Sequence, residues 1–325
     1  MDPLTGQWVI HAQKRAGRPN EFGLEPAPLT NPDTCPFCDG HEARTTPEIL
    51  AVGRPDGRPA DSAGWRLRVF PNLYPALRPD AEPAVGSALF PAEAGTGRHE
   101  VLVLTPDHRG SLATLGPDHL LEVLAAVRTR VAALAADPAV AHVLPFANHG
   151  PEAGATLSHP HLQILGAARV PELAARKQAN LAAWRRDTGG CLVCETLAAE
   201  QAAGDRMVLA NDRWSCHAPW ASRFPFEMRL IPLACQRDIT DTDDPDLEAL
   251  AALMGSVLRR LVKRHGDLSF NVVLHLAAVG DSAFHWHVDI LPRLTRLAGF
   301  EAGTGFAINS VTPEAAAHQL RGEGD

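Results

Sequence analysis

The sequence predicts an α+β fold built from two halves that share one order of elements. Each half begins with a Cys-x-x-Cys pair, followed by a strand, an amphipathic helix and two more strands. Potential ligands repeat as well, since His108 and His159 are 51 positions apart and Cys235 and His285 are 50 apart. Equivalent residues at equal spacing indicate an internal duplication. We therefore expect two antiparallel sheets, separate or merged into one larger sheet, with helices packed on them.

The first half is predicted to contain three strands and one helix. A largely apolar run predicts a buried strand, and apolar residues at helical spacing predict the helix that follows. A polar alternation then precedes Ile164 and Leu165, so that His159, His161 and Gln163 should project from one face of a strand. These elements are expected at residues 100–106 (strand), 117–136 (helix), 142–147 (strand) and 159–165 (strand).

The second half repeats this order after a connecting segment rich in Ala, Arg and Gln, which predicts a helix at 171–190 that ends at a glycine pair. Its elements are expected at residues 227–232 (strand), 245–264 (helix), 269–276 (strand) and 285–291 (strand). We divide the chain into a first half, 1–168, a connecting helix, 169–190, and a second half, 191–325. Chance repetition of a common strand and helix order is the alternative to duplication, and the matching ligand types argue against it.

Composition and charge exclude several classes of protein. The 325 residues, 45% hydrophobic and 21% charged, can form the cores of about two globular domains. The net charge of −8 and the lack of a basic run argue against a nucleic-acid-binding protein. No apolar run approaches the roughly 18 residues of a membrane span, and the N-terminus lacks a signal-peptide pattern. We expect a cytoplasmic protein that binds neither nucleic acid nor membrane.

The cysteines favour metal sites. Cysteines in a cytoplasmic chain serve as thiols or metal ligands more often than as disulfides, and neither Cys-x-x-Cys pair lies between a strand and a helix as redox motifs do. Structural zinc takes four Cys or His ligands. The expected ligand sets are Cys35, Cys38, His108 and His159 in the first half and Cys191, Cys194, Cys235 and His285 in the second. A buried core residue is the alternative for His159 and for Cys235, and it is our interpretation of Cys216, which has no partner in the repeat.

Within residues 148–165, a glycine-rich turn precedes the imidazoles of His159 and His161 and the amide of Gln163. Backbone N–H groups next to Gly150 and Gly154 can approach a phosphate closely. A neutral imidazole can attack phosphorus, because a pKa near 6.5 leaves one ring nitrogen unprotonated at pH 7. This stretch therefore suits chemistry at a phosphorus centre.

The same stretch, Asn-x-Gly…Gly-Ala-Thr…His-Pro-His-x-Gln, resembles the active-site motif of the galactose-1-phosphate uridylyltransferases, a branch of the histidine-triad superfamily. Further segments resemble that family in the same order along the chain. They are residues 3–10, 15–19, 35–38, 68–72, 106–108 and 299–301. Because the matches are colinear from residue 3 to beyond residue 300, the resemblance is more specific than any single motif.

The resemblance implies a zinc ion bound by the first ligand set. The second set resembles a branch of the family with zinc in both halves, although Cys235 stands where that branch usually has His. The family also has an iron site with a glutamate ligand. We expect iron to be absent, because the corresponding position falls near Lys177 and Gln178.

The resemblance implies a role for each residue of the site. His161 should form a covalent nucleotidyl intermediate, with its other ring nitrogen donating to a backbone carbonyl. Gln163 stands where hydrolytic members of the superfamily have a third histidine. An amide cannot shuttle a proton near neutrality, so glutamine favours transfer over hydrolysis. The residues expected to bind nucleotide and sugar phosphate are Arg15, Arg18, Asn72, Asn148, Gly154, Thr156 and Glu301. A solvated surface residue is the alternative for Arg18, and the roles of His149 and His287 stay open.

The implied activity is a ping-pong exchange in which UDP-glucose and galactose 1-phosphate give UDP-galactose and glucose 1-phosphate, catalysed by a homodimer. An ADP-glucose phosphorylase, which passes an adenylyl group to inorganic phosphate, is the first alternative. A non-catalytic zinc-binding nucleotide sensor is the second.

Overall fold

The computed structural model describes residues 1–17 and 30–322, and its largest element is a ten-stranded sheet. The strands of this sheet are β2 (Leu50–Val52), β3 (Leu67–Pro71), β4 (Gly97–Val103), β5 (His142–His149), β6 (His161–Ala167), β7 (Met207–Ala210), β8 (Trp214–His217), β9 (Met228–Pro232), β10 (Phe270–His275) and β11 (His287–Pro292). Their order is β2-β3-β4-β6-β5-β10-β11-β9-β8-β7, and each described pair is antiparallel. A second sheet pairs β1 (Val9–His11) with β12 (Ala307–Asn309) in parallel. The expected α+β class with antiparallel sheets is confirmed.

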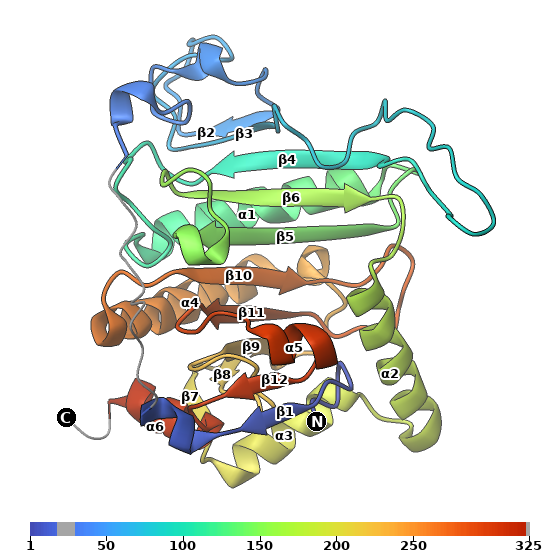
Figure 1. Cartoon of the computed structure of the whole chain (residues 1–325). Coiled ribbons are helices and arrows are strands. Elements are labelled where there is room, and N and C mark those ends of the chain that lie inside the picture. Colours follow the sequence, from blue (N-terminus) through green and yellow to red (C-terminus); the bar gives the residue numbers. More distant parts are fainter. Residues whose placement is uncertain (18–29, 323–325) are drawn as a thin grey trace.

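The sheets of the two halves merge at β5 and β10, which run side by side in the middle of the molecule (Figure 1). In this register Asn271 of β10 faces Asn148 of β5, and Val273 faces Phe146. Paired residues of an antiparallel ladder project from the same face of the sheet. The junction therefore places a side chain of the second half directly beside the motif around residues 148–165.

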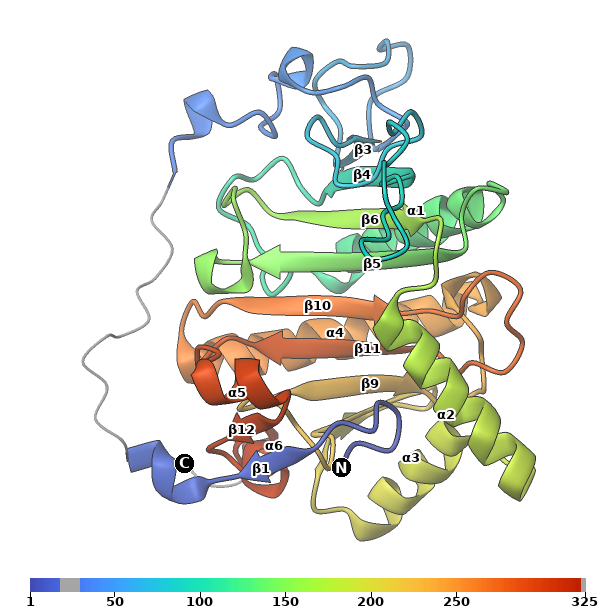
Figure 2. The same ribbon diagram turned by 45° about the vertical axis from the view of Figure 1, so that its right-hand side comes forward.

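The helices divide between the two faces of the sheet (Figures 1 and 2). The long helices α1 (Pro117–Ala135) and α4 (Asp244–His265) cover one face and pack against each other. On the other face, α2 (Glu172–Thr188), α5 (Gly299–Thr304) and the β1–β12 pair lie over the second half. Two further helices, α3 (Leu192–Ala203) and α6 (Pro313–Arg321), lie beside the β7 end of the sheet. No helix in the described ranges is long and apolar enough to cross a membrane.

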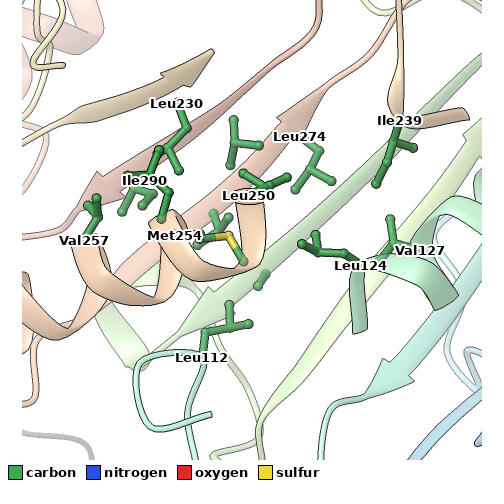
Figure 3. Packing of buried hydrophobic residues seen from close by; sticks show 14 of the residues in the cluster. Leu112, Leu124, Val127, Leu230, Ile239, Leu250, Met254, Val257, Leu274 and Ile290 are labelled. Atoms are coloured by element: carbon green, nitrogen blue, oxygen red, sulfur yellow. The ribbon is translucent and has the colours of Figure 1, made fainter. Parts of the chain in front are cut away.

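The main core lies between the sheet and the α1–α4 layer (Figure 3). The spacing of Leu250, Met254 and Val257 on α4 turns their side chains toward Leu230 and Ile290 of the sheet. All five side chains are buried. Complete burial of an aliphatic side chain of this size contributes about 1.5–3 kcal/mol, so these contacts fix α4 on the sheet of the second half.

Most expected elements are present, with small shifts at their ends. The helices expected at 117–136, 171–190 and 245–264 are α1, α2 and α4. The strand expected from His159 begins at His161, because the ladder with β4 starts at the Val103–His161 pair. The connecting helix ends at Gly189, which has a positive φ of 80° that glycine adopts readily. Sequence analysis did not anticipate α3 or the β1–β12 pair.

Candidate active site and metal-binding clusters

The first four-residue cluster has the dimensions of a zinc site. The ligand atoms of Cys35, Cys38, His108 and His159 all lie within 4.8 Å of one another. The two histidine Nδ1 atoms are 3.3 Å apart, and the Sγ atoms of Cys35 and Cys38 lie 3.7 and 3.6 Å from Nδ1 of His159. A tetrahedral site with zinc–ligand bonds of about 2.0–2.3 Å has ligand–ligand distances of about 3.3–3.8 Å. The donor set and its spacing fit zinc.

The second cluster, Cys191, Cys194, Cys235 and His285, has the same dimensions. Nδ1 of His285 lies 3.6 and 3.4 Å from the Sγ atoms of Cys191 and Cys194, and the Sγ atoms of Cys191 and Cys235 are 3.8 Å apart. The first two cysteines lie at the start of α3, where Cys191 is the N-cap residue. The structure thus brings together the four residues predicted for each half.

Backbone carbonyls orient the histidines of both clusters. Nε2 of His159 lies 2.8 Å from the carbonyl oxygen of Thr105, and Nε2 of His285 lies 3.1 Å from that of Pro232. Nε2 of His108 lies 3.1 Å from the carbonyl oxygen of Thr30. Since a carbonyl only accepts, each Nε2 carries the proton and each Nδ1 keeps a free lone pair. Outer hydrogen bonds of this kind are typical of metal-binding histidines.

His161, the predicted nucleophile, is the first residue of β6 and is buried. Its Nδ1 lies 2.8 Å from the carbonyl oxygen of His159, so Nδ1 carries the proton and Nε2 has the free lone pair. The edge of the ring contacts Phe37, with centroids 5.3 Å apart. Burial lowers the pKa of His161, which keeps the imidazole neutral. This is the tautomer that nucleophilic attack through Nε2 requires.

Gln163 projects from the same face of β6, and a histidine that sequence analysis missed holds its amide. Nδ1 of His99 accepts from the backbone N–H of Ala76 at 3.0 Å, so the proton of the neutral ring lies on Nε2. That Nε2 lies 2.8 Å from Oε1 of Gln163. The predicted ligand Asn72 is next to this pair, with Nδ2 3.1 Å from the same Nε2. Within the described ranges the amide nitrogen of Gln163 makes no hydrogen bond and is free for a ligand.

The glycine-rich turn between β5 and β6 brings the predicted phosphate-binding residues together. Gly150 and Gly154 flank a short 3-10 helix with φ angles of 78° and 84°, which favour glycine. The amide nitrogen of Asn148 faces Gly154, at 4.0 Å from where a Cβ atom would lie. Ala147 pairs with Leu162, so Asn148 comes next to His161 on the same face of the sheet.

A cavity of about 390 Å³ lies against this turn. Gly150, Thr156 and Ser158 line it together with the cluster ligand His108. His149, whose role stayed open, also lines the cavity and is held by Asp267, with Nε2 2.9 Å from Oδ1. Sequence analysis predicted Thr156 as a phosphate-binding residue, and its position on the cavity wall beside the turn is compatible with that role.

The structure does not bring every predicted ligand to His161. Arg15 lies in a 3-10 helix (Gln13–Gly17) that directly follows β1, and Glu301 lies in α5. β1 and α5 cover the second half, away from β6 (Figures 1 and 2). Oε2 of Glu301 is buried without a hydrogen-bond partner among the described residues. Arg18 lies outside the described residues, so its role stays a prediction.

The second half contains a counterpart of His161 that cannot act in the same way. His287 also begins its strand, and its Nδ1 lies 3.2 Å from the carbonyl oxygen of His285. Nε2 of His287, however, lies 2.8 Å from Nζ of Lys177 on α2. Both side chains are buried, so the lone pair that would attack a substrate accepts a hydrogen bond from lysine instead.

Lys177 is part of a buried network on β9, β10 and β11. His275, His287 and Asp289 could together offer three ligand atoms to a metal ion. Side chains of the protein already bind this group, because Nε of Arg229 donates to Oδ1 of Asp289 at 2.8 Å and Nζ of Lys177 donates to Nε2 of His287 at 2.8 Å. Burial lowers the pKa of Lys177 to about 7. The expected absence of iron stays a prediction. Its physical reason is that Arg229 and Lys177 already bind the side chains of Asp289 and His287, which a metal ion would need as ligands.

Comparisons with known proteins cover the full length of the chain. A family profile for galactose-1-phosphate uridyl transferase, N-terminal domain, matches residues 1–171. A profile for a domain of unknown function, DUF4921, matches residues 107–322. An ADP-glucose phosphorylase of Arabidopsis thaliana is 32% identical over 98% of this chain and 91% of its own length. The chain belongs to the galactose-1-phosphate uridyl transferase family.

Other members are similar over comparable lengths. A galactose-1-phosphate uridylyltransferase of Thermotoga maritima is 26% identical over 98% of this chain and 96% of its own length. The crystal structure of an Arabidopsis thaliana ADP-glucose phosphorylase with bound ADP-glucose superposes with a TM-score of 0.85 and 30% identity, covering 100% of this chain and 97% of that one. The expected family and the expected class of enzyme, a nucleotidyltransferase, are confirmed.

Proposed function

We propose that this protein transfers a nucleotidyl group from a nucleoside diphosphate sugar to a phosphate acceptor, through a covalent intermediate on His161. The observation that carries the proposal is the fixed tautomer of His161, whose Nδ1 donates to the carbonyl of His159. Asn148 and Gln163 project from the same face of the sheet as His161, and their amide nitrogens make no hydrogen bond within the described ranges. Such donors suit the non-bridging oxygens of a phosphoryl group.

The reaction consists of two displacements at one phosphorus atom. In the first, Nε2 of His161 bonds to the α-phosphorus while the bond from phosphorus to the oxygen of the sugar 1-phosphate breaks. The imidazole becomes positively charged, and the carbonyl of His159, hydrogen-bonded to Nδ1, stabilises that charge. In the second displacement an oxygen of the acceptor phosphate attacks the same phosphorus and the nitrogen–phosphorus bond breaks. His161 returns to its neutral form.

For the donor and acceptor, we favour ADP-glucose and inorganic phosphate. Support comes from the 32% identity with a protein named ADP-glucose phosphorylase, compared with 26–30% for uridylyltransferases of Thermotoga maritima and Streptomyces lividans. The second cysteine cluster agrees with this choice, because the branch with zinc in both halves, which the cluster resembles, includes ADP-glucose phosphorylases. The second candidate is the exchange between UDP-glucose and galactose 1-phosphate, which the uridylyltransferase relatives favour.

Zinc in both clusters forms part of the proposal. The four residues of each group would hold the ion with no position left for substrate, which is the arrangement of a structural site. The expected homodimer is retained as well. The elements that carry Arg15 and Glu301 lie over the second half of their own chain. In a homodimer, these residues of one chain would bind a sugar phosphate at His161 of the other chain.

Incubation with two labelled donors tests the reaction and its substrates. ADP-glucose and UDP-glucose, each with label in the α-phosphate, should be incubated with the wild-type protein and with His161→Ala. The wild-type protein should keep acid-labile label on the chain, and His161→Ala should keep none. Addition of phosphate or galactose 1-phosphate should then release the label as a nucleoside diphosphate or a nucleotide sugar, which identifies the acceptor. Equal labelling of both proteins would refute the role of His161.

A further inference from the structure

We propose that Asn271, in the second half of the chain, positions the phosphate-binding groups of the first half. The inference rests on the proposed function and deepens it, because it assigns to the second half a part in the reaction at His161. Asn271 lies on β10 in register with Asn148 of β5, and Asn148 lies next to His161 of β6. The three side chains form one row across three strands on the open face of the sheet.

Each hydrogen-bonding group of the Asn271 side chain has a defined partner. Its Nδ2 donates to Oδ1 of Asn148 at 2.7 Å and to the carbonyl oxygen of Ala153 at 2.9 Å. Its Oδ1 accepts from Nε of Arg293 at 2.6 Å. Because Arg293 can only donate and the carbonyl can only accept, the amide of Asn271 has a single satisfied orientation. Asn271 is 7% exposed, so water contributes little to this arrangement.

This orientation fixes the amide of Asn148. Since Oδ1 of Asn148 accepts from Asn271, its NH2 group must point the other way, toward Gly154. The NH2 group has no acceptor among the described residues, and a phosphoryl oxygen at the turn would supply one. A reversed amide would present its oxygen to that anion and repel it. The second bond of Asn271 holds the carbonyl of Ala153, the residue before Gly154, and so fixes the turn itself.

Arg293 extends this arrangement into the second half. Its guanidinium lies over the ring of Phe224, 4.3 Å from the centroid. The guanidinium is thus held by the ring of Phe224 on one face and by its hydrogen bond to Asn271. Arg293 follows β11 directly, so a residue anchored in the second half determines which way an amide of the first half points.

Asn271→Asp is the informative variant, because it keeps the shape of the side chain and its bond to Arg293. It removes both N–H donors, and the new oxygen beside Asn148 can only accept. The amide of Asn148 should reverse to donate to it, which turns its oxygen toward the phosphoryl group. The phosphoryl oxygen then loses its hydrogen bond from the NH2 group of Asn148 and is repelled by the amide oxygen. Labelling of His161 should therefore slow by about tenfold to a hundredfold.

Asn211→Asp provides a matched control. Asn211 is a partly buried asparagine of the second half, and its Nδ2 donates to the backbone carbonyl of Ala249. Its Oδ1 accepts from the backbone N–H groups of Arg213 and Trp214. The substitution is chemically the same, but among the described residues its partners include none of Asn148, Arg293 and Phe224. Thermal stability should fall in both variants, and the labelling rate should fall only in Asn271→Asp.

Asn271→Ala separates orientation from simple loss of structure. Alanine removes all three hydrogen bonds and some volume, yet it leaves the amide of Asn148 free to take either orientation. Single-turnover labelling with nucleotide sugar should therefore rank wild type fastest, Asn271→Ala intermediate and Asn271→Asp slowest. A merely structural role predicts that alanine is at least as harmful as aspartate, and that order would overturn the inference.

The remaining outcomes are also decisive. If Asn271→Asp is labelled at the wild-type rate, or slows no more than Asn211→Asp, Asn271 does not position the site and the proposed function stands. If the wild-type chain acquires no label from either nucleotide sugar, the proposed function fails and the inference fails with it.

Discussion

His99 and Gln163 form a hydrogen bond in which the histidine fixes the direction of the amide. Ala76 donates its backbone N–H to Nδ1 of His99, so Nε2 carries the proton that Oε1 of Gln163 accepts at 2.8 Å. Burial lowers the pKa of His99, which favours this neutral form. The NH2 group of Gln163 is consequently directed away from His99 and remains available to a phosphoryl oxygen.

Two substitutions of His99 should have different effects on nucleotidyl transfer. His99→Asn places an oxygen near Nδ1 and can still accept from Ala76, but it loses the donor to Gln163. His99→Gln reaches the position of Nε2 and can still donate. We expect His99→Asn to lower the rate of His161 labelling by about 2–10-fold, the usual worth of a hydrogen bond, and His99→Gln to retain most of it. Equal rates in the two variants would show that the bond does not orient Gln163.

Gln163→His should change the fate of the intermediate. A glutamine can bind the phosphoryl oxygen but cannot deliver a proton near neutrality, so water is a poor competitor for the acceptor phosphate. A histidine at this position can shuttle a proton and should raise hydrolysis while weakening transfer. The measurement is the ratio of free nucleoside monophosphate to transfer product. Leu165→His, which adds a histidine two residues further along β6, is the control. If Gln163→His leaves the transfer rate unchanged and does not increase hydrolysis, Gln163 has no part in controlling the fate of the intermediate.

The clusters predict about two zinc ions per chain, one for each four-residue group, and no bound iron. Cys235→Ala should lower the zinc content toward one, because three remaining ligands leave the second site open. Cys216→Ala is the matched control, since Cys216 is buried outside both clusters and should leave the zinc content unchanged. Elemental analysis of the purified proteins measures both. One zinc ion in the wild-type chain would mean that Cys235 or His285 is not a ligand.

Most of the architecture could be predicted because its signals are local. Helical spacing of apolar residues located α1 and α4, and the repeated distance between potential ligands located both clusters. The join between β5 and β10 could not be assigned, because the pairing of Asn148 with Asn271 links residues 123 positions apart without a sequence signal. His99 was missed for a similar reason. Its role depends on a backbone N–H at Ala76 and on the register of β4 with β6, which no local pattern encodes.

Lys177 should make the stability of the protein depend on pH in the alkaline range. Burial lowers its pKa from an ordinary value of 10.5 to about 7 in the folded state, so between these values the unfolded chain binds a proton that the folded chain does not. The contribution of Lys177 to the free energy of unfolding therefore rises with pH across this window, by at most about 1.4 kcal/mol per pH unit. Lys177→Met removes this term. The difference in melting temperature, wild type minus variant, should increase from pH 7 to pH 9.5.

Charged neighbours of Lys177 do not change the expected direction in which the difference in melting temperature varies with pH. Asp289, Asp2, Arg229 and Arg223 act on the lysine, but they remain in both proteins and largely cancel in the difference. Burial lowers the pKa of His275 to about 4, so this ring stays neutral throughout the window. Lys263→Met, at an exposed position near the end of α4, is the matched control. A flat or falling difference for Lys177→Met would show that the ammonium stays protonated, compensated within the network of Asp289.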